Sequence, residues 1–177
     1  MPAKILVVDD ERLIRWSLSE RLKKEGYQIV EAENGAMATE KFGSEMPDIV
    51  LLDLKLPDAD GLTLLKEFKS QSSSTPVLII TAFSAVDSAI EAMKLGAYDY
   101  IAKPFNMDEM VLILQRTLET TALRREVSAI VSEQRQRYGL QNIIGKSKKI
   151  LDILSLVRKV AKSEATTILL RGESGTG

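Results

Sequence analysis

Short apolar runs alternate with amphipathic stretches over about the first 121 residues. The apolar runs are rich in β-branched residues and are bounded by turn residues, which is typical of strands buried on both faces. The stretches between them place apolar residues three or four positions apart, as a helix with one buried face requires. The predicted strands cover residues 4–10, 27–32, 48–53, 75–81 and 98–103.

A helix is predicted after each of these strands. The predicted helices cover residues 11–25, 35–42, 62–68, 84–95 and 106–138. The apolar face of the first is expected to contain Leu13, Ile14, Leu18 and Leu22. Gly26 and Gly96 end two of the helices, and no Gly or Pro interrupts the last one. Strands that alternate with helices form a parallel sheet with right-handed crossovers, so we expect a doubly wound α/β domain with five parallel strands. The fifth strand is less apolar than the others and is expected nearer an edge.

Polar side chains stand where four of the predicted strands end. Asp9 and Asp10 follow the first, Asp53 the third, Thr81 ends the fourth and Lys103 the fifth. The carboxyl ends of parallel strands share one edge of the sheet, where ligands bind in this class of fold. Asp53 alone is equally well explained as a turn or capping residue, and the other strand ends favour a site.

Three converging carboxylates repel one another unless a cation lies among them. An all-oxygen ligand set with room for water favours Mg²⁺, which readily shares its shell with a phosphate. Lys103 adds a mobile positive charge and Thr81 a hydroxyl donor. These groups are suited to bind a phosphoryl group on Asp53, because phosphoryl transfer depends mainly on positioning and charge neutralisation.

The residues up to about 121 resemble a response-regulator receiver domain with the CheY-like, flavodoxin-like fold. The match lies in the paired acids, the central Asp53, Thr81-Ala82 and Lys103-Pro104-Phe105. The resemblance implies that Asp53 accepts a phosphoryl group from a phosphohistidine of a cognate sensor histidine kinase. It also implies that Asp10 binds Mg²⁺ directly, that Asp9 binds it through water, and that the backbone carbonyl of Lys55 is a further ligand.

The same resemblance assigns the switch residues. It implies that Thr81 bonds to the phosphoryl group, that Lys103 contacts it, and that Tyr100 turns inward when Thr81 moves. The Lys103–Pro104 bond is expected to be cis in this family. Lys55 and Phe83 lie where the family tunes the dephosphorylation rate, so no phosphoryl lifetime is predicted.

The charge of the chain changes near residue 121. Residues 1–121 carry 13 basic and 20 acidic side chains, whereas residues 122–177 carry 11 and 5. The basic residues follow a helical pattern without interleaved aromatics, which indicates a solvated helix face rather than a nucleic-acid site. Leu123, Val127 and Ile130 repeat at four-three spacing, a weak coiled-coil seam. We therefore expect a helical linker over 122–140 and a homodimer through the receiver and this helix.

Gly172, Gly175 and Gly177 match an incomplete nucleotide-binding P-loop after a predicted strand at 165–171. Together with Ile144-Gly145-Lys146-Ser147, this run resembles the opening of the AAA+ domain of NtrC-type, sigma-54-dependent transcription activators, so residues 141–177 are expected to begin such a domain. The lysine and the Ser or Thr of that motif would follow Gly177, so we expect a longer parent protein and no ATP hydrolysis by this chain. The resemblance implies that the parent binds ATP, DNA and sigma-54 RNA polymerase, and that this fragment binds no DNA.

Composition excludes several kinds of chemistry. The chain has no Cys and no His, which rules out disulfides, thiolate metal sites and Ser-His-Asp triads. No apolar run approaches the ~20 residues that span a bilayer, and the N-terminus lacks the pattern of a signal peptide. We expect a cytoplasmic protein without a membrane partner.

The preferred hypothesis is a two-component response regulator. In it, Mg²⁺-dependent phosphorylation of Asp53 switches the receiver and the linker dimer to control AAA+ assembly and sigma-54-dependent transcription, and the chain is not a classified enzyme. One alternative is a dimerisation module that works without phosphorylation. Another is a phosphatase of the haloacid-dehalogenase type, but that family has D-x-D-x-T where this chain has Asp9-Asp10-Glu11-Arg12-Leu13.

Overall fold

The computed structural model describes residues 2–82, 86–138, 147–160 and 169. The chain divides into two compact units, Met1–Glu126 and Val127–Gly177. The domain boundaries expected at residues 121 and 140 remain predictions. Within the described residues, every helix is too short or too polar to span a membrane.

A five-stranded parallel sheet forms the middle of the first unit, with strand order β2-β1-β3-β4-β5. Its strands are β1 (Lys4–Val8), β2 (Gln28–Ala32), β3 (Ile49–Leu52), β4 (Val77–Thr81) and β5 (Asp99–Ala102). All pairings are parallel, which confirms the predicted doubly wound sheet. The central strand β3 is buried at all four positions, and β5 lies at an edge as expected.

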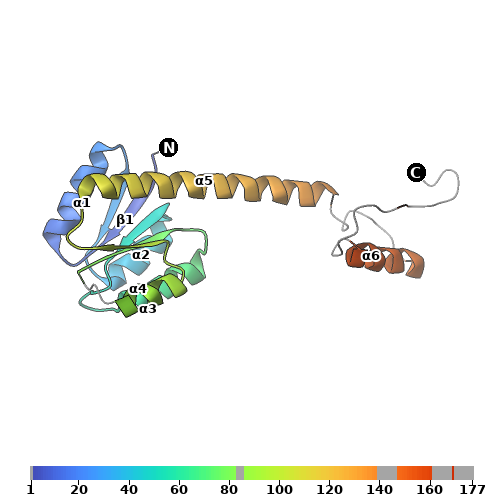
Figure 1. Ribbon diagram of the computed structural model, residues 1–177, viewed down its shortest axis with the longest axis horizontal. Coiled ribbons are helices and arrows are strands. Elements are labelled where there is room, and N and C mark those ends of the chain that lie inside the picture. Colours follow the sequence, from blue (N-terminus) through green and yellow to red (C-terminus); the bar gives the residue numbers. More distant parts are fainter. Residues whose placement is uncertain (1, 83–85, 139–146, 161–168, 170–177) are drawn as a thin grey trace. The chain divides into compact units, whose positions relative to one another are not determined.

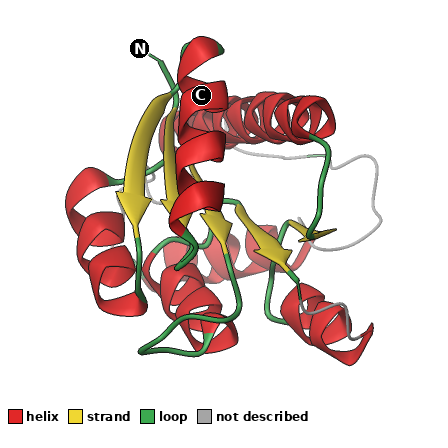
Figure 2. Cartoon of the chain, turned by 90° about the vertical axis from the view of Figure 1, so that its left-hand side faces the viewer, coloured by secondary structure: helices red, strands yellow, loops and turns green. Residues whose placement is uncertain are grey.

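Helices cover both faces of this sheet (Figures 1 and 2). They are α1 (Arg12–Lys24), α2 (Gly35–Glu45), α3 (Gly61–Gln71), α4 (Val86–Lys94) and α5 (Met107–Tyr138). Helices α1 and α5 pack on one face, where Leu18 and Leu114 meet alternate strand residues such as Ile5. Helices α2, α3 and α4 pack on the other face against the intervening residues, such as Leu6. Successive strand residues point to opposite faces, so burial on both faces explains the continuous apolar runs.

The pairing register brings the expected site residues to one edge. Val8 is paired with Leu52, so Asp9 and Asp53 follow at the same level. The backbone ladder continues past the strands: the Asp53 amide donates to the Val8 carbonyl at 2.9 Å, and the Lys103 amide donates to the Thr81 carbonyl at 2.9 Å. These bonds fix the backbone from which the polar side chains project.

Two predictions from the sequence were wrong: the buried face of α1 and the last residue of α2. Leu13, expected on the apolar face of its helix, is 81% exposed, whereas Arg15 and Ser19 are buried with Leu18 and Leu22. The buried face therefore follows the spacing 15, 18, 19 and 22, which Leu13 does not share. Helix α2 continues to Glu45, three residues beyond the predicted end at Phe42.

Helix α5 runs without a break from Met107 to Tyr138, close to its predicted bounds. The second unit contains the end of α5, from Val127, and the amphipathic helix α6 (Lys148–Val160). Gly172, Gly175 and Gly177 lie outside the described residues, as do Phe83 and all of the predicted strand at 165–171 except Leu169.

Candidate phosphorylation and metal site

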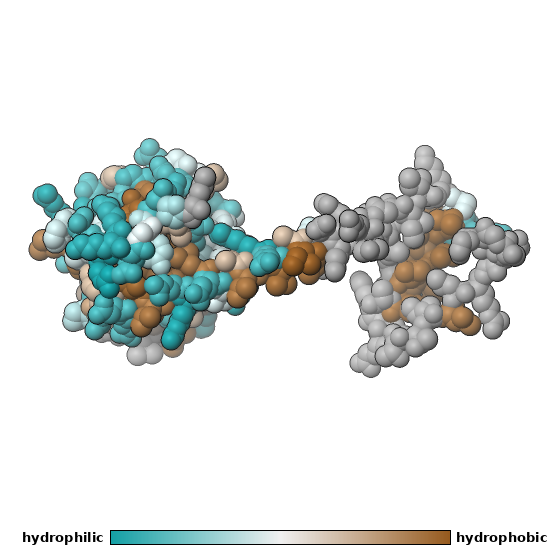
Figure 3. All heavy atoms as spheres, turned by 90° about the horizontal axis from the view of Figure 1, so that it is seen from above, coloured by the Kyte–Doolittle hydropathy of each residue, from teal (hydrophilic) through white to brown (hydrophobic). Residues whose placement is uncertain are grey.

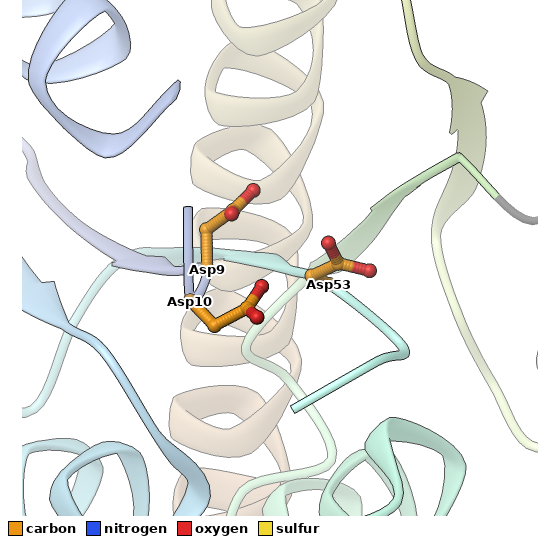
Figure 4. A group of neighbouring side chains, drawn as sticks. All are labelled: Asp9, Asp10 and Asp53. Carbon is orange, nitrogen blue, oxygen red and sulfur yellow. The ribbon is translucent and has the colours of Figure 1, made fainter. Parts of the chain in front are cut away.

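Three carboxylates gather at the carboxyl edge of the sheet. Asp9 and Asp10 lie after β1 and Asp53 after β3, and one oxygen from each lies within 4.8 Å of the others (Figure 4). Asp9 is 2% exposed and Asp53 is 4% exposed, whereas Asp10 faces solvent. The strand ends therefore bring together the three acids that the sequence predicted.

The Lys103 ammonium lies against both buried acids. Its Nζ lies 2.7 Å from Oδ2 of Asp9 and 2.6 Å from Oδ2 of Asp53, and it also lies 3.1 Å from Oε1 of Glu11. Burial by itself lowers the pKa of Lys103, but its hydrogen bonds to Asp53 and Asp9 outweigh burial and raise the pKa above its usual value. The side chain is therefore an ammonium that serves as the counter-ion of the cluster.

Burial raises the pKa of Asp9, and the nearby charge of Asp53 acts in the same direction. The hydrogen bonds from Lys103 and from the backbone amide of Glu11 work against this shift without cancelling it. Desolvation penalises the charged form of a buried acid, so a further cation beside Asp9 would stabilise its carboxylate.

The backbone around Asp53 is held from two sides. The amide of Lys55 donates to Oδ1 of Asp53 at 3.1 Å. Gly61, at the start of α3, donates its amide to the Leu54 carbonyl at 2.9 Å. A Cβ on Gly61 would lie 2.5 Å from the Leu54 Cα and 2.6 Å from the Asp53 carbonyl oxygen, so only glycine allows α3 to approach this closely.

Thr81 and Tyr100 lie on β4 and β5, the two strands that follow β3 in the sheet. Thr81 is buried at the end of β4, and Tyr100 on β5 is half-buried. Burial raises the pKa of Tyr100, and the charge of Asp53 raises it further. The Lys103–Pro104 bond is cis, as expected.

Three further residues support the site and were not predicted from the sequence. Glu11 contacts the Lys103 ammonium, and Arg15 donates from Nη1 to the carbonyl oxygens of Asp9 at 2.6 Å and Asp10 at 3.0 Å. Asp58 accepts the Gly35 amide at 2.7 Å and the Ala36 amide at 3.0 Å, so it binds the loop after Asp53 to the N-terminus of α2. Two of these residues could have been found from the sequence. Glu11 directly follows the paired acids, and Arg15 shares the helical spacing of Leu18 and Leu22, which places it on the buried face.

The donor set of this edge fits Mg²⁺. Carboxylate oxygens within 4.8 Å of one another suit a small divalent ion, and exposed Asp10 leaves one side open to the water that Mg²⁺ retains. Asp9, Asp10 and Asp53 are the residues that would hold it. A Cys- or His-selective metal has no ligands here, because the chain has neither residue.

Comparison with known proteins places this geometry in a family. The family model described as response regulator receiver domain matches residues 5–115. The chain is 38% identical over 174 residues to the regulatory protein AtoC of Escherichia coli K12, covering 98% of this chain and 38% of AtoC. It is 36% identical over 179 residues to the DNA-binding transcriptional regulator NtrC of the same strain, covering 98% of this chain and 36% of NtrC.

Solved structures agree with these relatives. NtrX from Brucella abortus, crystallised with ADP, superposes with a TM-score of 0.71 at 35% identity, covering 91% of this chain and 34% of that one. A CheY-like receiver domain protein from Methanospirillum hungatei gives a TM-score of 0.69 at 26% identity, covering 70% of this chain and 99% of that one. The chain thus spans little more than a third of the length of AtoC and NtrC. From the family match, the sheet and the acidic edge together, the chain belongs to the response-regulator receiver family.

Proposed function

We propose that this chain is a phosphorylation switch in which Asp53 accepts a phosphoryl group in a Mg²⁺-dependent reaction. The observation that carries the proposal is the convergence of Asp9, Asp10 and Asp53 within 4.8 Å beside the Lys103 ammonium. A carboxylate nucleophile, an oxygen-lined cation site and a mobile positive charge supply what phosphoryl transfer requires. The donor would be a phosphohistidine of a cognate sensor kinase.

The reaction balances without any other protein nucleophile. An oxygen of the Asp53 carboxylate forms a bond to phosphorus while the bond from phosphorus to the donor nitrogen or oxygen breaks, and the leaving group takes a proton from solvent. Mg²⁺ bound by Asp9, Asp10, Asp53 and the Lys55 carbonyl would neutralise charge on the phosphoryl oxygens. Lys103, now 2.6 Å from Asp53, is within reach of the new phosphoryl oxygens.

The proposed response runs through Thr81 and Tyr100. The phosphoryl group adds charge and hydrogen-bond acceptors beside the strand ends, which favours a bond from the Thr81 hydroxyl. Movement of Thr81 would leave room for Tyr100 on the next strand to turn inward. A local change of charge would in this way bias a second conformation of the surface around β5 and the start of α5.

Helix α5 carries the proposed output. Leu123, Val127 and Ile130 are 62%, 59% and 50% exposed and repeat at four-three spacing on the helix. Apolar side chains along this stretch are coloured brown in Figure 3. A seam of this kind is covered by a second copy of the same helix in a coiled coil, so we propose a homodimer through the receiver and linker.

The remaining proposals concern a longer, cytoplasmic parent. The similarity to AtoC and NtrC extends beyond the receiver into residues 141–177, which we assign to the beginning of an AAA+ domain that includes Gly172, Gly175 and Gly177. In the parent, phosphorylation would control assembly of the AAA+ ring and sigma-54-dependent transcription, with ATP, DNA and sigma-54 RNA polymerase as partners. The fragment itself would bind no DNA, would need no membrane, and would not act as a classified enzyme.

Intact-mass spectrometry after incubation with acetyl phosphate and Mg²⁺ tests the proposed function. The wild-type chain and Asp108→Asn, a variant of an exposed acid on α5, should each gain the mass of one phosphoryl group. Asp53→Asn should gain none, and neither should the wild-type chain in EDTA. Equal labelling of Asp53→Asn would remove Asp53 from its proposed role. Sedimentation of the wild-type chain and of Asp53→Asn, each with and without a phosphodonor, tests the alternative. If the phosphodonor changes the dimerisation of neither chain, the phosphorylation-independent dimerisation module would be favoured instead.

A further inference from the structure

The guanidinium of Arg15 lies under the acidic edge. Arg15 belongs to the buried face of α1, one turn after the loop that carries Asp9 and Asp10. A buried charge is costly unless hydrogen bonds and opposite charge compensate for it. The partners of a buried arginine therefore indicate why it is retained in place of an apolar residue.

The main partners of Arg15 are main-chain carbonyls of the two acids. Nη1 donates to the carbonyl oxygen of Asp9 at 2.6 Å and to that of Asp10 at 3.0 Å. Nη2 lies 3.4 Å from Oε2 of Glu33, whose side chain is 61% exposed. The strongest contacts are thus made with the backbone that sets the direction of both carboxylates, and the ion pair with Glu33 is secondary.

These bonds complete the support of the loop. The amide of Asp9 donates to the Ala32 carbonyl at 3.1 Å, and the amide of Glu11 donates to Oδ1 of Asp9 at 2.9 Å. Arg15 adds the two carbonyls, so the peptide groups on both sides of Asp10 are held. With one nitrogen bridging two consecutive carbonyls, rotation of either peptide would break a charge-assisted bond.

We infer that Arg15 is a positioning residue for the divalent-cation site. It holds the Asp9–Asp10 loop so that both carboxylates face Asp53, and it does so without contacting the cation or the phosphoryl group. The inference rests on the proposed function, because it assumes that the three acids bind Mg²⁺. It differs from a purely structural role in one respect: loss of Arg15 should change the affinity for Mg²⁺ in a chain that is still folded.

The test compares Arg15→Gln and Arg15→Lys in the full chain with Arg12→Gln, a control at an exposed position of the same helix. Mg²⁺ is added in steps, and the amide shifts of residues near Asp10 and Lys55 are followed by NMR, which also reports whether each variant is folded. Arg15→Gln should weaken Mg²⁺ binding by about tenfold or more, as is usual when a group that orients a metal ligand is lost. Arg15→Lys should fall in between, because an ammonium reaches one carbonyl more readily than two.

A second readout separates positioning from catalysis. At saturating Mg²⁺, the rate at which acetyl phosphate labels Arg15→Gln should return to nearly the wild-type value. A rate that stays low at saturation would overturn the inference, because Arg15 would then act in the transfer step. Wild-type Mg²⁺ affinity in folded Arg15→Gln or in Arg15→Lys, with only the urea midpoint lowered, would also overturn it by showing a structural role alone. Failure of the wild-type chain to bind Mg²⁺ would contradict the proposed function instead.

Discussion

At the scale of single residues, the main feature of the site is the close approach of like charges. Two buried acids and one exposed acid share a small volume, and the Lys103 ammonium lies against both buried ones. Burial raises the pKa of Asp9 even with this ammonium beside it. Three carboxylates face one ammonium, so a divalent cation among them would balance the remaining negative charge.

Lys103→Met should destabilise the Mg²⁺-free chain by about 1–3 kcal/mol, because Asp9 and Asp53 would lose a buried charged partner. Urea unfolding in EDTA measures the change. Mg²⁺ should restore more stability to this variant than to the wild type, since the ion replaces the lost charge. Lys66→Met, at an exposed position on α3, is the control. Equal stability of Lys103→Met and the control in EDTA would contradict the charge pairing.

Asp58→Asn should lower the urea midpoint at neutral pH and do so less in acid. The amides of Gly35 and then Ala36 lower the pKa of Asp58 by bonding to its charged form. A depressed pKa in the folded state contributes stability above the unfolded pKa, and this stability is lost as the pH falls through the folded pKa. Glu40→Gln, at an exposed position on α2, is the control. A pH-independent effect of Asp58→Asn would refute this role of the carboxylate.

At the scale of elements, α3 begins directly against the backbone of Asp53. Gly61→Ala places a Cβ within 2.6 Å of Asp53 and Leu54 backbone atoms, so either α3 or the end of β3 must move. Gly43→Ala is a matched control in α2, because a Cβ there meets nothing within 4 Å. Thermal unfolding should show Gly61→Ala to be less stable and Gly43→Ala to be more stable, the latter by up to ~1 kcal/mol from helix propensity. Acetyl phosphate should label only Gly61→Ala more slowly, and a wild-type rate there would contradict the close packing.

The later part of α5 should mediate self-association. Ile130→Asp puts a charge into the apolar seam and should weaken the dimer, because a buried unpaired carboxylate is costly. Ser128→Asp adds the same charge at an exposed position outside the four-three pattern and should leave the dimer intact. Sedimentation equilibrium distinguishes the two variants. Equal association of both would show that this seam is not the interface.

At the scale of the whole molecule, the sequence was informative wherever burial and chain direction alone decide the structure. Strands buried on both faces give continuous apolar runs, and parallel strands share one carboxyl edge, so Asp9, Asp53 and Lys103 were predicted to meet. The position of Arg15 was missed because Leu13 continues an apolar pattern that α1 does not bury. Asp58 was missed because its partners, Gly35 and Ala36, come from a distant helix that only the tertiary fold brings to it.

The most direct measurement of the central claim is chemical mapping of the phosphoryl group. The chain is incubated with acetyl phosphate with and without Mg²⁺, the acyl phosphate is reduced with borohydride, and the peptides are sequenced by mass spectrometry. The reduced residue should be Asp53, and it should be found only when Mg²⁺ is present. Reduction at another acid, or at Asp53 equally in EDTA, would contradict the account.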